Sequence, residues 1–121
     1  MALLTKENII ACKDKPTEVV SVPEWNGEVV VQCFSSKERE EIESALLEGK
    51  KEGETPSLIN HRARVVALAI VDPEDNTKKM FSLEEIKILA DKNATAIHRI
   101  YKAAIKLSKM RREDIEEAEK N

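Results

Sequence analysis

The residues most often used in enzyme chemistry are few in this chain and lie far apart. They are two cysteines and two histidines: Cys12, Cys33, His61 and His98. No two of them have the Cys-x-x-Cys or His-x-x-x-His spacing with which short motifs build zinc sites. We therefore predict no metal site, and we expect both cysteines to be free thiols that pack as small hydrophobic side chains.

Other catalytic arrangements are also missing from the sequence. The glutamates between positions 38 and 48 have the spacing of a solvated helix face, on which Lys37 and Glu41 can pair. The three glycines lie too far apart to form a phosphate-binding loop. The sequence thus predicts no catalytic residue, no cofactor and no enzymatic activity.

Composition limits the class of protein further. A chain of 121 residues forms one domain, here taken as 1–121. Charged residues make up 36%, against about 25% in typical globular domains. No apolar run reaches the roughly 18 residues of a membrane span, and the N-terminus lacks the pattern of a signal peptide. We expect a protein of a reducing cytoplasm that binds no membrane.

A basic stripe lies near the end of the chain, within 99–112. Its members are Lys102, Lys106, Lys109, Arg111 and Arg112. The stripe keeps open an alternative function, a small nucleic-acid-binding or regulatory module. Three observations argue against it: the net charge is −3, no aromatic residue alternates with the cations for base stacking, and the acidic segment 113–119 follows directly. We expect no more than weak, salt-sensitive association with nucleic acid.

The first part of the chain reads as a short helix and a β-hairpin. Thr5 is a predicted N-cap for a helix that runs to Cys12, with Leu4 and Ile9 at the positions of a hydrophobic staple. Two valine-rich runs follow, at 17–22 and 29–32, with the period of two that strands show. Between them Asn26-Gly27 predicts a tight turn, and we expect Gly27 to take the positive φ.

Amphipathic helices follow the hairpin. Capping boxes formed by Ser35 with Glu38 and by Ser82 with Glu85 mark two helix starts, and Asn93 can cap a third. The inward residues of these helices are predicted to be Ile42, Ala45 and Leu46, then Ile86, Leu89 and Ala90, then Ile97, Ile100, Tyr101, Ala104 and Leu107. The fold class is therefore mainly α (α+β): an N-terminal β-hairpin followed by a small bundle of amphipathic helices.

The segment 59–71 leaves two structures open. Its length favours a buried helix, whereas its β-branched residues favour a buried strand. Arg62 and Arg64 border the longest apolar run of the chain, and we expect them to form salt bridges across the fold.

Four apolar residues are predicted to bind a partner. Leu46 and Leu47 stand beside a polar loop, and Met110 and Ile115 lie near the C-terminus. The segment 110–121 is predicted to be a loosely held C-terminal helix. Burial of Ile115 would contribute about 2 kcal/mol, less than the cost of ordering several residues. Trp25 is expected to be a packing anchor at the tip of the hairpin.

Several short segments, taken in order, resemble the tail assembly chaperones of long-tailed (siphophage-type) bacteriophages. They are Leu4-Thr5-Lys6-Glu7-Asn8-Ile9, Val22-Pro23-Glu24-Trp25-Asn26-Gly27, Arg62-Ala63-Arg64-Val65-Val66, Phe81-Ser82-Leu83-Glu84-Glu85, Ile105-Lys106-Leu107-Ser108 and Glu116-Glu117-Ala118-Glu119-Lys120-Asn121. The chain departs from the family pattern at Asp75-Asn76, where glycine is frequent. It also has Lys109-Met110-Arg111-Arg112 where the family often breaks the helix, which leaves open whether the last two helices are fused or separate.

The resemblance implies a helical domain without enzymatic activity, whose partner is the tape measure protein. Such a chaperone would keep the tape measure protein soluble, help to recruit tail tube protein and be absent from the mature virion. The resemblance further implies a homo-oligomer, association with a frameshift-extended form of the same chain, and a location in the bacterial host cytoplasm.

Overall fold

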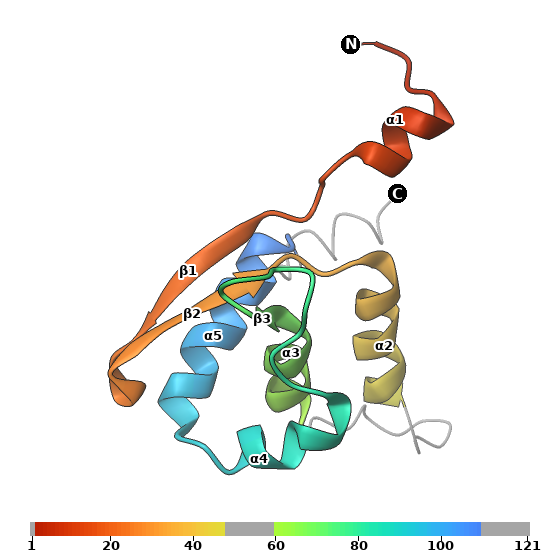
Figure 1. The fold of residues 1–121 in the computed structure, drawn as a ribbon. Coiled ribbons are helices and arrows are strands. Elements are labelled where there is room, and N and C mark those ends of the chain that lie inside the picture. Colours follow the sequence, from red (N-terminus) through yellow and green to blue (C-terminus); the bar gives the residue numbers. More distant parts are fainter. Residues whose placement is uncertain (1, 48–59, 110–121) are drawn as a thin grey trace.

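The computed structural model describes residues 2–47 and 60–109. It is an α+β fold in which a three-stranded antiparallel sheet is followed by helices, which confirms the predicted fold class (Figure 1). The elements are α1 (Lys6–Ala11), β1 (Thr17–Val22), η1 (Pro23–Trp25), β2 (Gly27–Gln32), α2 (Ser36–Leu47), α3 (His61–Ala69), β3 (Ile70–Val71), η2 (Leu83–Glu85), α4 (Ile86–Ala90) and α5 (Ala94–Leu107). The predicted C-terminal helix, 110–121, lies outside the described residues.

The hairpin forms as predicted, with β2 in the middle of the sheet. β1 pairs with β2 along its whole length, from Thr17 opposite Gln32 to Val22 opposite Gly27. β2 also pairs with the short β3, where Val31 lies opposite Ile70. Both of those side chains are fully buried. The alternating pattern of the sequence therefore identifies the face of the sheet that meets the core.

The turn of the hairpin differs from the prediction. Four residues connect the strands, and Asn26, not Gly27, has the left-handed conformation, with φ of 55°. Gly27 is the first residue of β2, and a Cβ there would meet only the Trp25 carbonyl oxygen, at an ordinary 3.9 Å. Asparagine tolerates the left-handed region better than most residues, so it can end the single turn η1.

The ambiguous segment 59–71 contains both predicted structures. Its residues from His61 to Ala69 form α3, and Ile70–Val71 continue directly as β3. Six of the nine helical residues are buried, because α3 contacts α2, α4 and α5. A helix covered on several sides has no exposed stripe, which explains why the sequence shows no helical period here.

The core lies between the sheet, α3 and α5. Its largest fully buried side chains are Val22, Val31, Ile42, Val65, Val66, Ile70, Val71, Leu89 and Ile100. α5 contacts both strands of the hairpin and α3, and its predicted inward face is correct, with Ile97, Ile100 and Ala104 buried. Ala90, predicted to face inward, is exposed because it is the last residue of α4.

Side-chain caps set the helix ends as the sequence predicts. Ser35 N donates to Glu38 Oε1 at 2.9 Å and Glu38 N donates to Ser35 Oγ at 3.1 Å, which completes the capping box of α2. The box predicted at Ser82 is also present, and Ala96 N donates to Asn93 Oδ1 at 3.0 Å at the start of α5.

α5 ends at Leu107, just before the segment for which the sequence leaves open whether the last two helices are fused. Ser108 is its C-cap, and Lys109 has a left-handed φ of 56°. Ser108 Oγ also accepts a hydrogen bond from Phe34 N at 3.0 Å. A residue with positive φ after the C-cap ends an α-helix, so α5 does not continue through Lys109. The residues from 110 onward lie outside the described part of the chain.

Candidate partner-binding surface

The side chains that could bind a metal or take part in catalysis lie apart in the described part of the fold. Within residues 2–47 and 60–109, no three His, Cys, Asp or Glu side chains come together as metal ligands. Cys12 is exposed at the end of α1, contrary to its expected place in the core, and Cys33 is half-buried. Among the described residues, the cysteines and histidines do not come together, because the elements that carry them lie in different parts of the fold.

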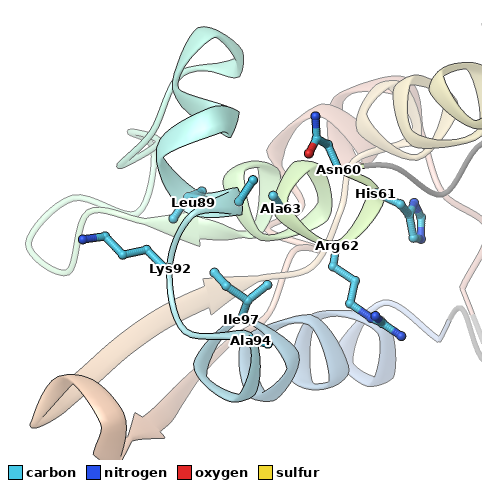
Figure 2. Close-up of a pocket in the computed structure, with 9 residues that line it drawn as sticks. Asn60, His61, Arg62, Ala63, Leu89, Lys92, Ala94 and Ile97 are labelled. Atoms are coloured by element: carbon cyan, nitrogen blue, oxygen red, sulfur yellow. The ribbon is translucent and has the colours of Figure 1, made fainter.

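A cavity of about 240 Å³ lies between the start of α3, the end of α4 and the start of α5 (Figure 2). Ala63, Leu89 and Ile97 form its apolar part. The polar side chains at its edge do not converge on a common point: Figure 2 shows those of Asn60, His61, Arg62 and Lys92 directed away from one another. Ligand sites need a few convergent polar groups, so this geometry does not support a substrate site.

The N-terminal arm, residues 2–16, is the part of the structure with least contact to the core. It consists of α1 and an extended segment that leads into β1, and Figure 1 shows α1 held away from the body. Thr5 and Asn8 cap α1 reciprocally, with Asn8 N donating to Thr5 Oγ1 at 3.2 Å and Thr5 N donating to Asn8 Oδ1 at 3.1 Å. No residue of α1 is buried.

The arm carries large apolar side chains into solvent. Leu3, Leu4, Ile9 and Ile10 are exposed to 97%, 70%, 61% and 73%. The hydrophobic staple expected between Leu4 and Ile9 therefore buries little surface. An isolated helix of six residues is marginal in water, and tertiary packing usually supplies the stability of such helices. The arm is thus an unpartnered apolar element, the kind of surface that marks a protein-binding site.

Sequence reasoning missed this arm as a binding surface. It placed the partner-binding residues elsewhere: Leu47 is 55% exposed at the end of α2, Leu46 is half-buried, and Met110 and Ile115 lie outside the described residues. One feature of the sequence could have indicated the arm: the polar segment 13–16 separates the apolar residues of positions 3 to 10 from the hairpin. A second exposed apolar set lies around α4 and comprises Met80, Leu83 and Ile88.

Arg99, the first residue of the range 99–112 that contains the basic stripe, is paired within the fold. Arg99 binds Glu24 at the hairpin tip through three contacts of 2.9 to 3.1 Å. The hydrogen bond from Arg99 lowers the pKa of Glu24. Lys102 and Lys106 are exposed on α5. The expectation of weak nucleic-acid binding stays a prediction, and the pairing of Arg99 reduces the charge available to phosphates.

Tyr101 organises a small polar cluster between α3 and α5. His61 Nε2 lies 3.2 Å from Tyr101 Oη, and Arg62 Cζ lies 5.6 Å from the centroid of the tyrosine ring. Burial lowers the pKa of His61, and the nearby Arg62 and Arg64 lower it further. Within the described residues Arg62 contacts an aromatic ring instead of forming the expected salt bridge.

A buried ion pair connects α2 to the segment after β3. Glu38, whose side chain is 12% exposed, binds the ammonium group of Lys79. Lys79 Nζ also donates to the Leu68 carbonyl oxygen at 2.6 Å. Burial raises the pKa of Glu38, but its hydrogen bonds with Lys79 and Ser35 outweigh burial and lower it overall. The pair is a structural connection, because the two charges are paired with each other within the fold.

Comparison with known proteins indicates a common origin. A family model described as phage tail assembly chaperone matches residues 9–121. The solved structure of the bacteriophage HK97 tail assembly chaperone is similar in fold, with a TM-score of 0.60 and 17% sequence identity over 84% of this chain and 90% of that chain. None of the curated proteins matches. None of the helices in the described residues is long and apolar enough to span a membrane.

Proposed function

Because the chain belongs to the phage tail assembly chaperone family, we propose that it binds the tape measure protein and keeps it soluble during tail assembly. A long tape measure protein exposes apolar helical faces until the tail tube encloses it. A chaperone that covers these faces must itself present apolar surface to solvent. The binding reaction is non-covalent and involves no enzymatic step.

The N-terminal arm is the observation that supports this proposal. Its side chains of Leu3, Leu4, Ile9 and Ile10 are 61% to 97% exposed, and no residue of α1 is buried. An apolar face of a partner helix would bury them, and helix–helix contact would stabilise α1 at the same time. The family match begins at Ile9, so it includes the second pair of these residues and not the first.

We place the other partner contacts on the four apolar residues that the sequence singles out. Leu46 and Leu47 close α2, and Met110 and Ile115 follow α5 in sequence. Several copies bound along one tape measure protein would help to recruit tail tube protein. The proposal includes a homo-oligomer, association with a frameshift-extended form, action in the host cytoplasm and absence from the mature virion.

Coexpression of the chain with the tape measure protein of the same phage tests the arm directly. Ile10→Asp should leave the thermal midpoint of the isolated chain unchanged, because Ile10 is 73% exposed. The same substitution should weaken binding to the tape measure protein at least about tenfold, which corresponds to roughly 1.4 kcal/mol. Recovery of soluble tape measure protein should fall as a result.

Lys6→Glu is the matched control, because it makes a larger change of charge on a polar position of the same helix. It should keep the tape measure protein soluble. Full solubility with both Ile10→Asp and Leu4→Asp present would show that the arm is not the binding surface. Insoluble tape measure protein in the presence of the unmodified chain would contradict the proposed function itself.

A further inference from the structure

A shallow apolar groove runs along one side of α5. Its volume is about 240 Å³, and the side chains that line it are His98, Tyr101, Lys102, Ile105 and Lys106. Tyr101 and Ile105 are half-buried and lie one helical turn apart, so together they form the apolar floor of the groove. The lining positions extend over about 12 Å of helix, which is enough to contact about two turns of a second helix.

Positive charge borders this floor. Lys102 and Lys106 are exposed along α5, and the guanidinium of Arg62 lies over the Tyr101 ring, 5.6 Å from its centroid. Neither α3 nor α5 contains an Asp or Glu residue. Within the described part of the chain, none of the ion pairs includes Arg62, Lys102 or Lys106. The border of the groove therefore attracts acidic groups, although the chain as a whole has a net charge of −3.

We propose that this groove binds an amphipathic helix of a partner protein, in which acidic residues flank a ridge of branched apolar side chains. The ridge would cover Tyr101 and Ile105, and the carboxylates beside it would pair with Lys102 and Lys106. None of the residues of the N-terminal arm lines the groove. The inference thus concerns a second binding site and does not depend on the partner proposed for the arm.

Charge distinguishes this occupant from the exposed apolar arm of a second copy. The arm carries three basic residues, Lys6, Lys13 and Lys15, and only two acidic ones, Glu7 and Asp14. Its charge is therefore slightly positive, and the lysines of the groove would repel it. Like charges across an interface disfavour a partner, so the arm does not fit here.

The floor of the groove distinguishes the proposed helix from nucleic acid, which the same cations also attract. The exposed surface of the groove is almost entirely apolar, and Ile105 supplies an aliphatic side chain on which no base can stack. The guanidinium of Arg62 already lies over the Tyr101 ring. A phosphate backbone would use only the cations, whereas an acidic amphipathic helix uses the cations and the apolar floor together.

Titration of the full-length chain with synthetic peptides tests the proposal. The probe is a peptide of about 18 residues, long enough to form a helix, with leucines along one face and glutamates on either side of them. In the control peptide, lysine replaces each glutamate. Nuclear magnetic resonance should show that the acidic peptide shifts the amide resonances of Tyr101 and Ile105. At physiological salt it should bind at least about tenfold more tightly than the lysine peptide.

Variants of the chain and of the peptide separate charge from apolar contact. Lys102→Glu with Lys106→Glu should weaken binding of the acidic peptide at least about tenfold and make the lysine peptide the tighter ligand. An acidic peptide with serine in place of leucine should also bind at least about tenfold more weakly, because it offers charge without an apolar ridge. Lys87→Glu with Lys92→Glu is the control: it changes the net charge equally, outside the groove, and should leave both affinities unchanged.

Equal affinity for the acidic and lysine peptides would overturn the proposal, as would equal affinity for the leucine and serine peptides. An oligonucleotide that shifts the same resonances and binds more tightly than the acidic peptide would assign the surface to nucleic acid instead. Shifts of Ile105 that grow with protein concentration in the absence of peptide would assign it to a second copy. Each of these outcomes would leave the proposed role of the arm standing, because that role is tested with the tape measure protein.

Discussion

Glu38 shows how one residue combines two functions that the sequence presents separately. Its backbone N–H and one carboxylate oxygen complete the capping box of α2, which the Ser35-x-x-Glu38 spacing predicts. Its other oxygen binds Lys79, forty-one positions later in the chain, which no local pattern indicates. The residue is therefore more sensitive to substitution than an ordinary cap.

We expect Glu38→Gln to lower the free energy of unfolding by about 1–2 kcal/mol. The amide keeps an acceptor for Ser35 N but leaves the Lys79 ammonium without its counter-ion. Loss of one partner of a buried pair costs about 3–5 kcal/mol, and the value is smaller here because Lys79 is 36% exposed. Denaturant titration measures the difference.

Glu43→Gln is the matched comparison on the same helix. Glu43 pairs with Arg39 in solvent, with side chains 59% and 44% exposed. It should change stability by no more than about 0.5 kcal/mol. Equal effects of the two substitutions would show that the Glu38–Lys79 pair adds nothing to stability beyond a surface contact.

At the scale of single elements, the two residues of the predicted Asn-Gly turn have different conformations in the hairpin. Asn26 carries the positive φ, and Gly27 lies in regular strand conformation. Asn26→Val should destabilise the protein by about 1–2 kcal/mol, because a β-branched residue resists the left-handed region. Thermal or denaturant unfolding provides the measurement.

Gly27→Ala is the control for that substitution. Its new methyl group meets only the Trp25 carbonyl oxygen at 3.9 Å, so stability should change by less than about 0.5 kcal/mol. The opposite ranking, with Gly27→Ala the more harmful change, would restore the original assignment of the turn to glycine.

Local signals account for the elements that the sequence predicted correctly. The helix caps at Thr5, Ser35, Ser82 and Asn93 depend on contacts within three residues, so the spacing of residue types in the sequence predicts them. The strands and the face of α5 follow from periodicity. Each of these features is decided by neighbours in the chain.

Tertiary packing decides the features that the sequence missed. α3 and β3 share one buried segment, so the change from helix to strand at Ile70 has no periodic signal. The sequence also does not show that the arm is exposed, because Ile9 and Ile10 have the apolar character of core residues, whereas the structure leaves them 61% and 73% exposed. The candidate binding surface could therefore be predicted only in its general character, as exposed apolar residues near helix ends.

For the whole molecule, we expect stability to fall as the pH decreases through the range where histidine titrates. The pKa of His61 is lowered in the folded protein from its ordinary value of 6.5. Unfolded chains then bind a proton that the folded chain does not, so the free energy of unfolding decreases below about pH 6.5. Denaturant titrations from pH 7.5 to pH 5.5 measure this loss.

His61→Gln should make stability less dependent on pH in that range, whereas His98→Gln, which removes an exposed histidine of α5, should preserve the dependence. An unchanged pH profile in His61→Gln would show that burial and the neighbouring Arg62 and Arg64 do not disfavour the protonated ring. The lowered pKa of Glu38 adds a second loss at more acidic pH, below the ordinary value of 4.5 for glutamate.

The hydrogen bond from Phe34 N to Ser108 Oγ joins residues seventy-four positions apart, and α5 also packs on both strands of the hairpin. During synthesis on the ribosome, the first strands must therefore wait for the last described helix before they can complete their packing. Contacts of such long range slow folding and leave early segments uncovered. The domain therefore completes its packing only after Ser108 has been synthesised.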